Sequence, residues 1–207
     1  FGLDLHWLPH AHGSLEVARL LKQFHPGTPI IMGGISASYY HEELITYPQV
    51  DYVLRGDSTE EPLRQLIQAI AGGVSARQLR QIPNLTWKDG KRRPHINPLT
   101  HVPTHLDDIL VDYSVVVNAV ARERNLSNYL PFAKWTKYPI TAALTCRGCP
   151  RNCAICGGSA FASKHIFGRS QPAYRSPEVV ASDLRRISRF SRGPVFVLGD
   201  IRQAGMD

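Results

Sequence analysis

The sequence predicts an α/β fold built on a parallel, doubly wound sheet. Short apolar runs alternate with amphipathic stretches through residues 1–72, and a second unit of the same kind occupies residues 138–200. Of the 207 residues, 43 % are hydrophobic and 20 % are charged, which is an ordinary globular balance. Repeated strand–helix units of this length favour parallel strands with helices on the sheet faces. The composition excludes wholesale disorder, and no apolar run approaches the ~18–20 residues of a membrane span.

Three strand–helix units fit into the first 72 residues. The expected elements are strands at 3–8, 29–32 and 50–54, and helices that start at Ser14, span 39–47 and start at Ser58. Ser58 and Glu61 have the spacing of a capping box, in which each side chain bonds a free backbone N–H of the first turn. Gly72-Gly73 is expected to end the third helix.

Residues 83–137 have a different character. Two short apolar runs, 85–87 and 94–96, flank Asp89-Gly90, and Asp-Gly is a strong hairpin signal. Residues 98–113 contain prolines and an Asp pair and indicate an extended linker, whereas 114–137 indicate a helix broken at Pro131. The expected domains are therefore 1–82, a hairpin and linker at 83–137, and a second α/β part at 138–207.

The second α/β part is expected to open with a strand at 140–144 and to reach another strand at 195–198. A helix from Ser176 to about Phe190 joins them, because Ser176-Pro177-Glu178 combines a cap, a proline at the first helical position and an early acid. The loop between the first strand and this helix holds all four cysteines of the chain.

The cysteines indicate a metal or cluster site in a reducing, cytoplasmic compartment. Cys146, Cys149, Cys153 and Cys156 form one dense group, whereas a secreted disulfide framework spreads its cysteines. The last three have the spacing C-x-x-x-C-x-x-C. Three thiolates on one loop can hold three irons of a cubic four-iron cluster and leave the fourth iron open.

Two other kinds of cysteine site fit the spacing less well. A zinc ribbon separates its C-x-x-C pairs by ~15–20 residues, whereas three residues separate the pairs here. An electron-carrier ferredoxin has its cysteines in a different order. Both fit less well than a cluster with one open iron.

This loop, directly after an apolar strand, resembles that of the radical S-adenosylmethionine (SAM) superfamily. The resemblance implies a 4Fe-4S cluster on Cys149, Cys153 and Cys156 whose open iron chelates SAM. An electron from the cluster then cleaves SAM to a 5′-deoxyadenosyl radical, and a reductant protein such as flavodoxin or ferredoxin supplies that electron. The segment Arg147-Gly148-Cys149-Pro150 matches a phrase of the family. Members of the family have Ser or another small residue just before this phrase, at the position of Cys146. The resemblance therefore implies that Cys146 is not a ligand.

Further residues of the second part fit the same resemblance. Gly157-Gly158 lets the backbone approach a ligand closely. Asp200 follows the strand at 195–198, where barrel active sites gather polar residues, and is a candidate SAM contact, with a loop acid or helix cap as the alternative. Ile155 departs from the family, in which many members have an aromatic residue beside the adenine.

The first part resembles the cobalamin (vitamin B12)-binding domain of one radical SAM class. The segments that match in order and spacing are 22–26, Ile31-Met32-Gly33-Gly34, 50–57 and 60–63. The resemblance implies a Rossmann-like domain in which Gly33 and Gly34 line the groove for the nucleotide tail, followed by the opening of a radical SAM β/α barrel. The loop that faces the cobalt in such domains would precede Phe1, so the residues present do not indicate an axial ligand of the cobalt. His6, His10 and His12 could form a small metal site, but an unmetallated loop is favoured.

Both ends of the chain are expected to be cut from a longer protein, because Phe1 is not Met and a strand lies just before the end. The resemblance implies a cobalamin-dependent radical SAM enzyme, most commonly one that transfers a methyl group to a carbon radical of an unknown small-molecule substrate. From Arg147 onward there are nine Arg, one Lys and four acids. This excess leaves open a tRNA methylthiotransferase, although a nucleic-acid partner is less favoured than a solvated basic surface. A non-enzymatic corrinoid or iron–sulfur carrier is the remaining alternative.

Overall fold

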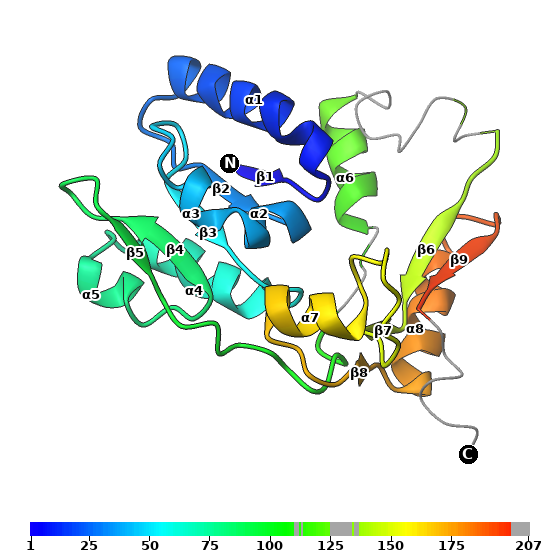
Figure 1. Ribbon diagram of the computed structural model, residues 1–207. Helices are drawn as coiled ribbons and strands as arrows, with labels where there is room; N and C mark the ends of the chain where they lie inside the picture. Colours follow the sequence, from blue (N-terminus) through cyan, green and yellow to red (C-terminus); the bar gives the residue numbers. More distant parts are fainter. Residues whose placement is uncertain (110–111, 113, 125–133, 135–136, 200–207) are drawn as a thin grey trace. The chain divides into compact units, whose positions relative to one another are not determined.

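The computed structural model describes residues 1–109, 112, 114–124, 134 and 137–199, and it divides into two compact units (Figure 1). Unit 1 comprises Phe1–Pro103 and Cys149–Gln171, and unit 2 comprises Thr104–Gly148 and Pro172–Asp207. The segment that carries the last three cysteines therefore belongs to the unit formed by the first part of the chain. The linear division into 1–82, 83–137 and 138–207 stays a prediction.

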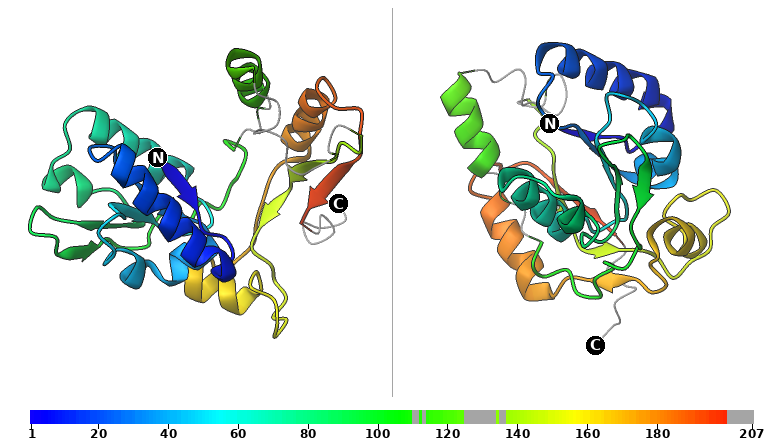
Figure 2. Two further views of the ribbon diagram at one scale, coloured as in Figure 1. Left: turned by 90° about the horizontal axis from the view of Figure 1, so that it is seen from above. Right: turned by 90° about the vertical axis from the view of Figure 1, so that its left-hand side faces the viewer.

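Unit 1 is built on a five-stranded sheet in the order β1-β2-β3-β4-β5. Its strands are β1 (Gly2–Asp4), β2 (Ile31–Gly33), β3 (Tyr52–Leu54), β4 (Leu85–Lys88) and β5 (Pro94–Ile96). The first three are parallel, and Asp4 pairs with Gly33, so their carboxyl ends lie at one edge of the sheet. The expected hairpin forms β4 and β5 and extends the sheet antiparallel to β3 (Figure 2). The prediction of a parallel-rich α/β fold is confirmed.

Helices cover both faces of this sheet. They are the 3₁₀ helix η1 (Leu8–His10) and the α-helices α1 (Ala11–Phe24), α2 (Ile35–Tyr39), α3 (His41–Leu44), α4 (Glu60–Ala71) and α5 (Ala76–Leu79). On one face, Leu66 of α4 packs with Tyr52 and Trp87 of the sheet. On the other face, Leu44 of α3 packs with Met32 and Val53. None of the described helices has the length and apolar character that crossing a membrane requires.

Several boundaries expected in the first 72 residues are wrong. The strand expected at 3–8 is limited to Gly2–Asp4, because the chain turns into η1, where Pro9 suits the first turn of a helix. The helix expected to start at Ser14 begins at Ala11. The helix expected over 39–47 is two short ones, α2 and α3, which meet at Tyr40.

The capping box expected at Ser58 and Glu61 is also wrong. The N-cap of α4 is Thr59, without a side-chain cap. The hydroxyl of Ser58 donates to Asp57 instead, and Glu61 accepts from Arg64 in the next turn. A capping box is present at Ser75 and Gln78, where short α5 begins.

Unit 2 contains the second strand–helix–strand unit. Its elements are α6 (Ser114–Glu123), β6 (Thr141–Leu144), β7 (Cys146–Arg147), β8 (Ala173–Tyr174), α8 (Pro177–Ile187) and β9 (Val195–Leu198). As expected, β6 and β9 are parallel and α8 follows the cap residue Ser176, with proline in its first turn. The short antiparallel ribbon β7–β8 was not predicted. The break expected at Pro131 lies outside the described residues, and the continuation of β6 and β9 into a barrel stays a prediction.

A buried ion pair organises unit 2. The side chains of Arg175 and Asp183 are 0 % and 1 % exposed, and their charged atoms lie 2.6 Å apart. Arg175 also donates to the backbone oxygens of Leu144, at 3.0 Å, and Ile109, at 2.8 Å. One guanidinium therefore joins the end of β6, the helix α8 and the segment that precedes α6.

We predict that Arg175→Gln lowers the free energy of unfolding by about 3–5 kcal/mol, because it leaves the Asp183 carboxylate buried without its counterion. Urea unfolding followed by far-UV circular dichroism measures this loss. The matched control is Arg185→Gln, an exposed position on the same helix, for which a change within about 0.5 kcal/mol is expected. Equal stability of the Arg175→Gln and Arg185→Gln variants would contradict the organising role of Arg175.

Candidate functional site

The carboxyl edge of β1–β3 is the first candidate site. Open α/β sheets bind their ligands outside the carboxyl ends of parallel strands. At this edge the chain continues from β1 into Leu5 and His6, and from β2 into Gly34. Helix α2 is held there, because the N–H of Ala37 donates to the Leu5 oxygen at 3.2 Å and the Ser36 hydroxyl donates to the His6 oxygen at 3.0 Å. The edge is therefore a fixed backbone surface.

The two glycines after β2 are in different surroundings. Gly34 has φ +105°, and a Cβ there would lie 2.5 Å from Asp4 Oδ1 and 2.8 Å from the Leu5 backbone. The fold itself therefore requires glycine at position 34. A Cβ at Gly33 would meet only the Leu54 oxygen, at 3.9 Å. Of the pair, Gly33 is the residue with room for an approaching ligand, and the tail-groove role of both stays a prediction.

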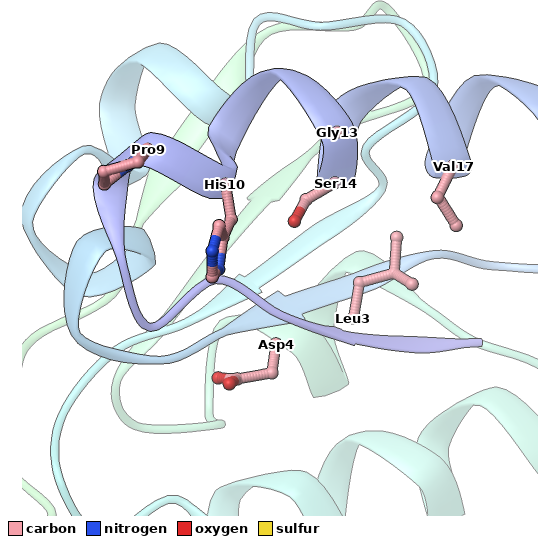
Figure 3. A pocket seen from close by; sticks show the side chains of 7 residues that line it. All are labelled: Leu3, Asp4, Pro9, His10, Gly13, Ser14 and Val17. Atoms are coloured by element: carbon pink, nitrogen blue, oxygen red, sulfur yellow. The ribbon is translucent and has the colours of Figure 1, made fainter. Parts of the chain in front are cut away.

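A cavity of about 400 Å³ lies between the end of β1 and the start of α1. Figure 3 shows Asp4 and His10 beside it, with the Ser14 hydroxyl between helix and strand. Within the described residues, no group of three or more His, Cys, Asp or Glu side chains is arranged to hold a metal ion. The histidine metal site that the sequence left open, at His6, His10 and His12, is therefore not formed in this structure.

The loop after β3 contains a buried guanidinium. Arg55 is 8 % exposed and donates to the Asn97 backbone oxygen. Burial, together with the positive charge of Arg55, lowers the pKa of His41 to about 4, so His41 is neutral at neutral pH. The Nδ1 atom of His41 lies 3.1 Å from the Thr86 hydroxyl. These contacts join α3 to β4, and the loop after β3 to the segment after β5.

The cysteine loop is the second candidate site in unit 1. None of the four cysteines of the chain is in a disulfide; Cys149 is half-buried, and Cys153 and Cys156 are exposed. Hydrogen bonds between residues close in sequence shape the loop. The Cys156 N–H donates to the Cys153 oxygen at 3.2 Å, and the Arg151 N–H donates to Cys149 Sγ at 3.4 Å. The three thiols are not gathered into a ligand set in this structure. Three thiols on an open loop are nevertheless the donor chemistry that an iron–sulfur cluster takes.

The surroundings of the loop leave space beside these thiols. A Cβ at Gly157 would meet no atom within 4 Å, and one at Gly158 would meet only Cys156 Sγ, at 3.9 Å. Internal packing therefore does not require glycine at either position. Ile155 is fully exposed. The roles of Gly157 and Gly158 in cofactor binding stay predictions.

Helix α7 (Ala160–Phe167) follows the loop and was not predicted. Ser159 caps it by accepting from the Ala162 N–H, and Gly168 ends it in the left-handed conformation. The next residue, Arg169, is 3 % exposed. It pairs with Asp57, from Nε to Oδ2 at 2.5 Å and from the second terminal nitrogen to Oδ1 at 3.0 Å.

Arg169 makes two further bonds. It donates to the Pro103 oxygen at 2.9 Å and to the Ser58 hydroxyl at 3.1 Å. The role of Arg169 could not be predicted from the sequence, because its partner Asp57 lies 112 positions earlier in the chain. No local spacing connects the two.

Cys146 differs from the other cysteines. It is buried in β7 of unit 2, and a Cβ at Gly199 would collide with its sulfur and lie 2.8 Å from the Thr145 hydroxyl oxygen. Gly199 has φ +107°, so the end of β9 closes over this thiol through a residue that must be glycine. That Cys146 is not a cluster ligand stays a prediction. Asp200, the candidate SAM contact, lies outside the described residues.

Comparison with solved structures identifies the fold. The chain is similar to the radical S-adenosylmethionine methyltransferase TsrM from Kitasatospora setae with cobalamin and a [4Fe-4S] cluster bound, at a TM-score of 0.67 and 14 % identity over 98 % of this chain and 38 % of that one. The same protein with tryptophan substrate and the SAM analog aza-SAM gives 0.65 and 17 % over 91 % and 34 %.

A second protein has the same likeness. The cobalamin-dependent S-adenosylmethionine radical enzyme OxsB, with aqua-cobalamin and S-adenosylmethionine bound, gives a TM-score of 0.65 and 15 % identity over 95 % of this chain and 25 % of that one. The chain thus spans well under half the length of these solved chains. No family model and no curated protein matches it. At this identity the likeness shows the fold alone, which this chain shares with part of TsrM and part of OxsB.

We predict that Gly34→Ala destabilises the chain and that Gly33→Ala does not. Strain at the positive φ of Gly34 alone costs about 1–3 kcal/mol, and the contacts with Asp4 and Leu5 add to it. Thermal unfolding of both variants measures the difference, with Gly33→Ala as the neighbouring control. Unchanged stability of Gly34→Ala would show that Asp4 and Leu5 can move away from this glycine.

Proposed function

We propose that this chain is the cobalamin-binding unit and the opening of the radical SAM unit of a cobalamin-dependent radical SAM enzyme. The observation that carries the proposal is the presence of three cysteines, none of them in a disulfide, within eight residues of one loop, in a chain with the fold of TsrM and OxsB. Neither the loop nor the fold would suffice alone, because thiols also bind zinc and one fold serves many functions.

In this proposal the cysteine loop holds the iron–sulfur cluster. Cys149, Cys153 and Cys156 supply three thiolates, and Gly157-Gly158 leaves space beside them for the backbone to approach a ligand. When bound, a cluster with one open iron supplies one-electron reduction of a ligand on that iron, here SAM. Because Cys153 and Cys156 are exposed, the loop is open to assembly of the cluster.

The carboxyl edge of β1–β3 binds cobalamin in the same proposal. Gly33 offers the open backbone surface for the nucleotide tail, whereas Gly34 keeps α2 and the end of β1 in close contact. The chain's contribution is to bind and orient the cofactors. Methyl transfer to a carbon of a small-molecule substrate is the reaction we propose for the whole enzyme, with an electron-carrier protein such as flavodoxin or ferredoxin as the reductant.

We predict that anaerobic reconstitution loads about four irons per chain and that Cys149→Ala, Cys153→Ala and Cys156→Ala each abolish the cluster. Iron and sulfide analysis and electron paramagnetic resonance of the reduced protein measure it. Each substitution removes one of three thiolates, and two cannot hold a cubic cluster.

The matched control is Cys146→Ala, which removes the buried thiol of β7 and is expected to leave the cluster largely intact. Loss of the cluster in Cys146→Ala to the same degree as in the other three would show that the ligand set is different. Zinc in place of iron in all preparations would contradict the proposed function.

We further predict that Gly33→Leu weakens cobalamin binding and spares the cluster, because the new side chain fills the open surface at the end of β2. Titration with hydroxocobalamin, followed by absorbance, gives the dissociation constant. Gly27→Leu, at an exposed glycine where a Cβ would meet no atom within 4 Å, is the control and is expected to leave cobalamin affinity unchanged. Wild-type affinity in Gly33→Leu would remove this edge from the cobalamin site.

A further inference from the structure

The contact between the two candidate sites of unit 1 is a buried ion pair. The side chains of Arg169 and Asp57 are 2 % and 15 % exposed. Asp57 lies in the loop after β3, at the carboxyl edge of the sheet, and Arg169 follows the helix that the cysteine loop opens. The guanidinium uses its planar fork on the carboxylate and two further N–H groups on Ser58 and Pro103.

Hydrogen bonds continue from this pair to the glycine that the sheet edge requires. The N–H of Gly56, next to Asp57, donates to the Ser38 hydroxyl at 3.0 Å, and that hydroxyl donates to the Gly34 oxygen at 2.9 Å. Helix α2, which carries Ser38, also packs against α7 (Figure 1). Both the polar contacts and the helix packing thus connect the edge of the sheet with the segment after the cysteines.

The C-terminal end of α7 also packs against the segment that follows β5. Gly168 has φ +70°, and a Cβ there would lie 3.3 Å from Leu99 and 3.4 Å from Val102, two residues of the segment that follows β5. Arg169 therefore leaves the helix in a fixed conformation between packed side chains. Such a side chain has one arrangement available to it, which is what a positioning role requires.

We infer that Arg169 is a positioning residue that acts through Asp57: it fixes the cysteine loop to the carboxyl edge of the first sheet, so that ligand binding at the edge and cluster binding on the loop are coupled. The inference rests on the proposed function for the identity of the two ligands. A group bound at the edge orders the loop after β3 and hence Asp57. A cluster on the cysteines orders α7 and hence Arg169. Each event therefore makes the other more favourable.

The first experiment uses the chain without cofactors. Hydrogen–deuterium exchange is measured in the wild type, Arg169→Gln, Asp57→Asn and the double variant. Loss of the pair should raise exchange in α7 by about tenfold or more, because breaking a buried pair is strongly destabilising locally, while α1 stays protected. The second substitution should add little once the first is present, as expected for two members of one pair.

The control is Arg64→Gln, which removes an arginine from the exposed pair with Glu61 in the same unit. It should leave exchange in α7 unchanged. Arg169→Lys keeps the charge and loses the fork, and should give an intermediate rise. Wild-type exchange of α7 in both Arg169→Gln and Asp57→Asn would overturn the inference, whether or not cofactors bind.

The second experiment measures the coupling itself. Hydroxocobalamin affinity is determined for the chain with and without its reconstituted cluster. In the wild type and in Arg64→Gln the cluster should tighten binding by about fivefold or more, the lower end of typical coupling between sites. In Asp57→Asn and Arg169→Lys, variants chosen to remain folded, that ratio should fall toward one. A merely structural role would weaken stability without changing this ratio.

The outcomes separate the two proposals. A wild-type chain that takes up neither iron nor cobalamin contradicts the proposed function, and the coupling is refuted with it. A wild-type chain that binds both, with the same cobalamin affinity in the presence and absence of the cluster, refutes the coupling alone. A ratio that persists in Asp57→Asn refutes the role of the ion pair.

Discussion

The ion pair between Asp57 and Arg169 is the contact on which the arrangement of unit 1 depends. It joins the loop after the third parallel strand to a segment 112 positions later. Removing two charges from water is costly, and a buried pair returns that cost only when the geometry is good and the remaining donors are satisfied. Here Ser58 and Pro103 accept two of the three remaining N–H groups. Such a pair specifies one arrangement of the two segments more than it adds to stability.

Features that depend on short-range patterns were predictable from the sequence. The hairpin at Asp89-Gly90 and the start of α8 after Ser176 were expected from local patterns, and both elements are found. The details differ, because Ser176 makes no side-chain cap bond and the left-handed residue of the turn is Arg92. The capping box expected at Ser58 failed for a long-range reason, because its hydroxyl is engaged by Asp57 and Arg169. Within α4, Leu66 and Ala69 face the core, whereas Ile67 is 52 % exposed.

In the candidate site, too, short-range features could be predicted from the sequence and long-range contacts could not. The proposed cluster ligands could be predicted from the cysteine spacing, because such a cluster takes its ligands from one short loop. The Gly33-Gly34 pair is equally visible, but the two positions need glycine for different reasons, and only the approach of Asp4 and Leu5 to Gly34 separates them. Arg169 could not be found, because nothing near it in the sequence indicates a partner at position 57.

The division of the chain into two units has a topological consequence. The polypeptide passes from one unit to the other between Pro103 and Thr104, between Gly148 and Cys149, and between Gln171 and Pro172. A single cleavage therefore cannot separate them, and neither unit is complete until residues near position 171 have been synthesised. The sheet of unit 1 can form early during translation, but its tie to α7 must wait until the first strand of unit 2 has emerged. The order of synthesis thus delivers part of unit 2 before unit 1 is complete.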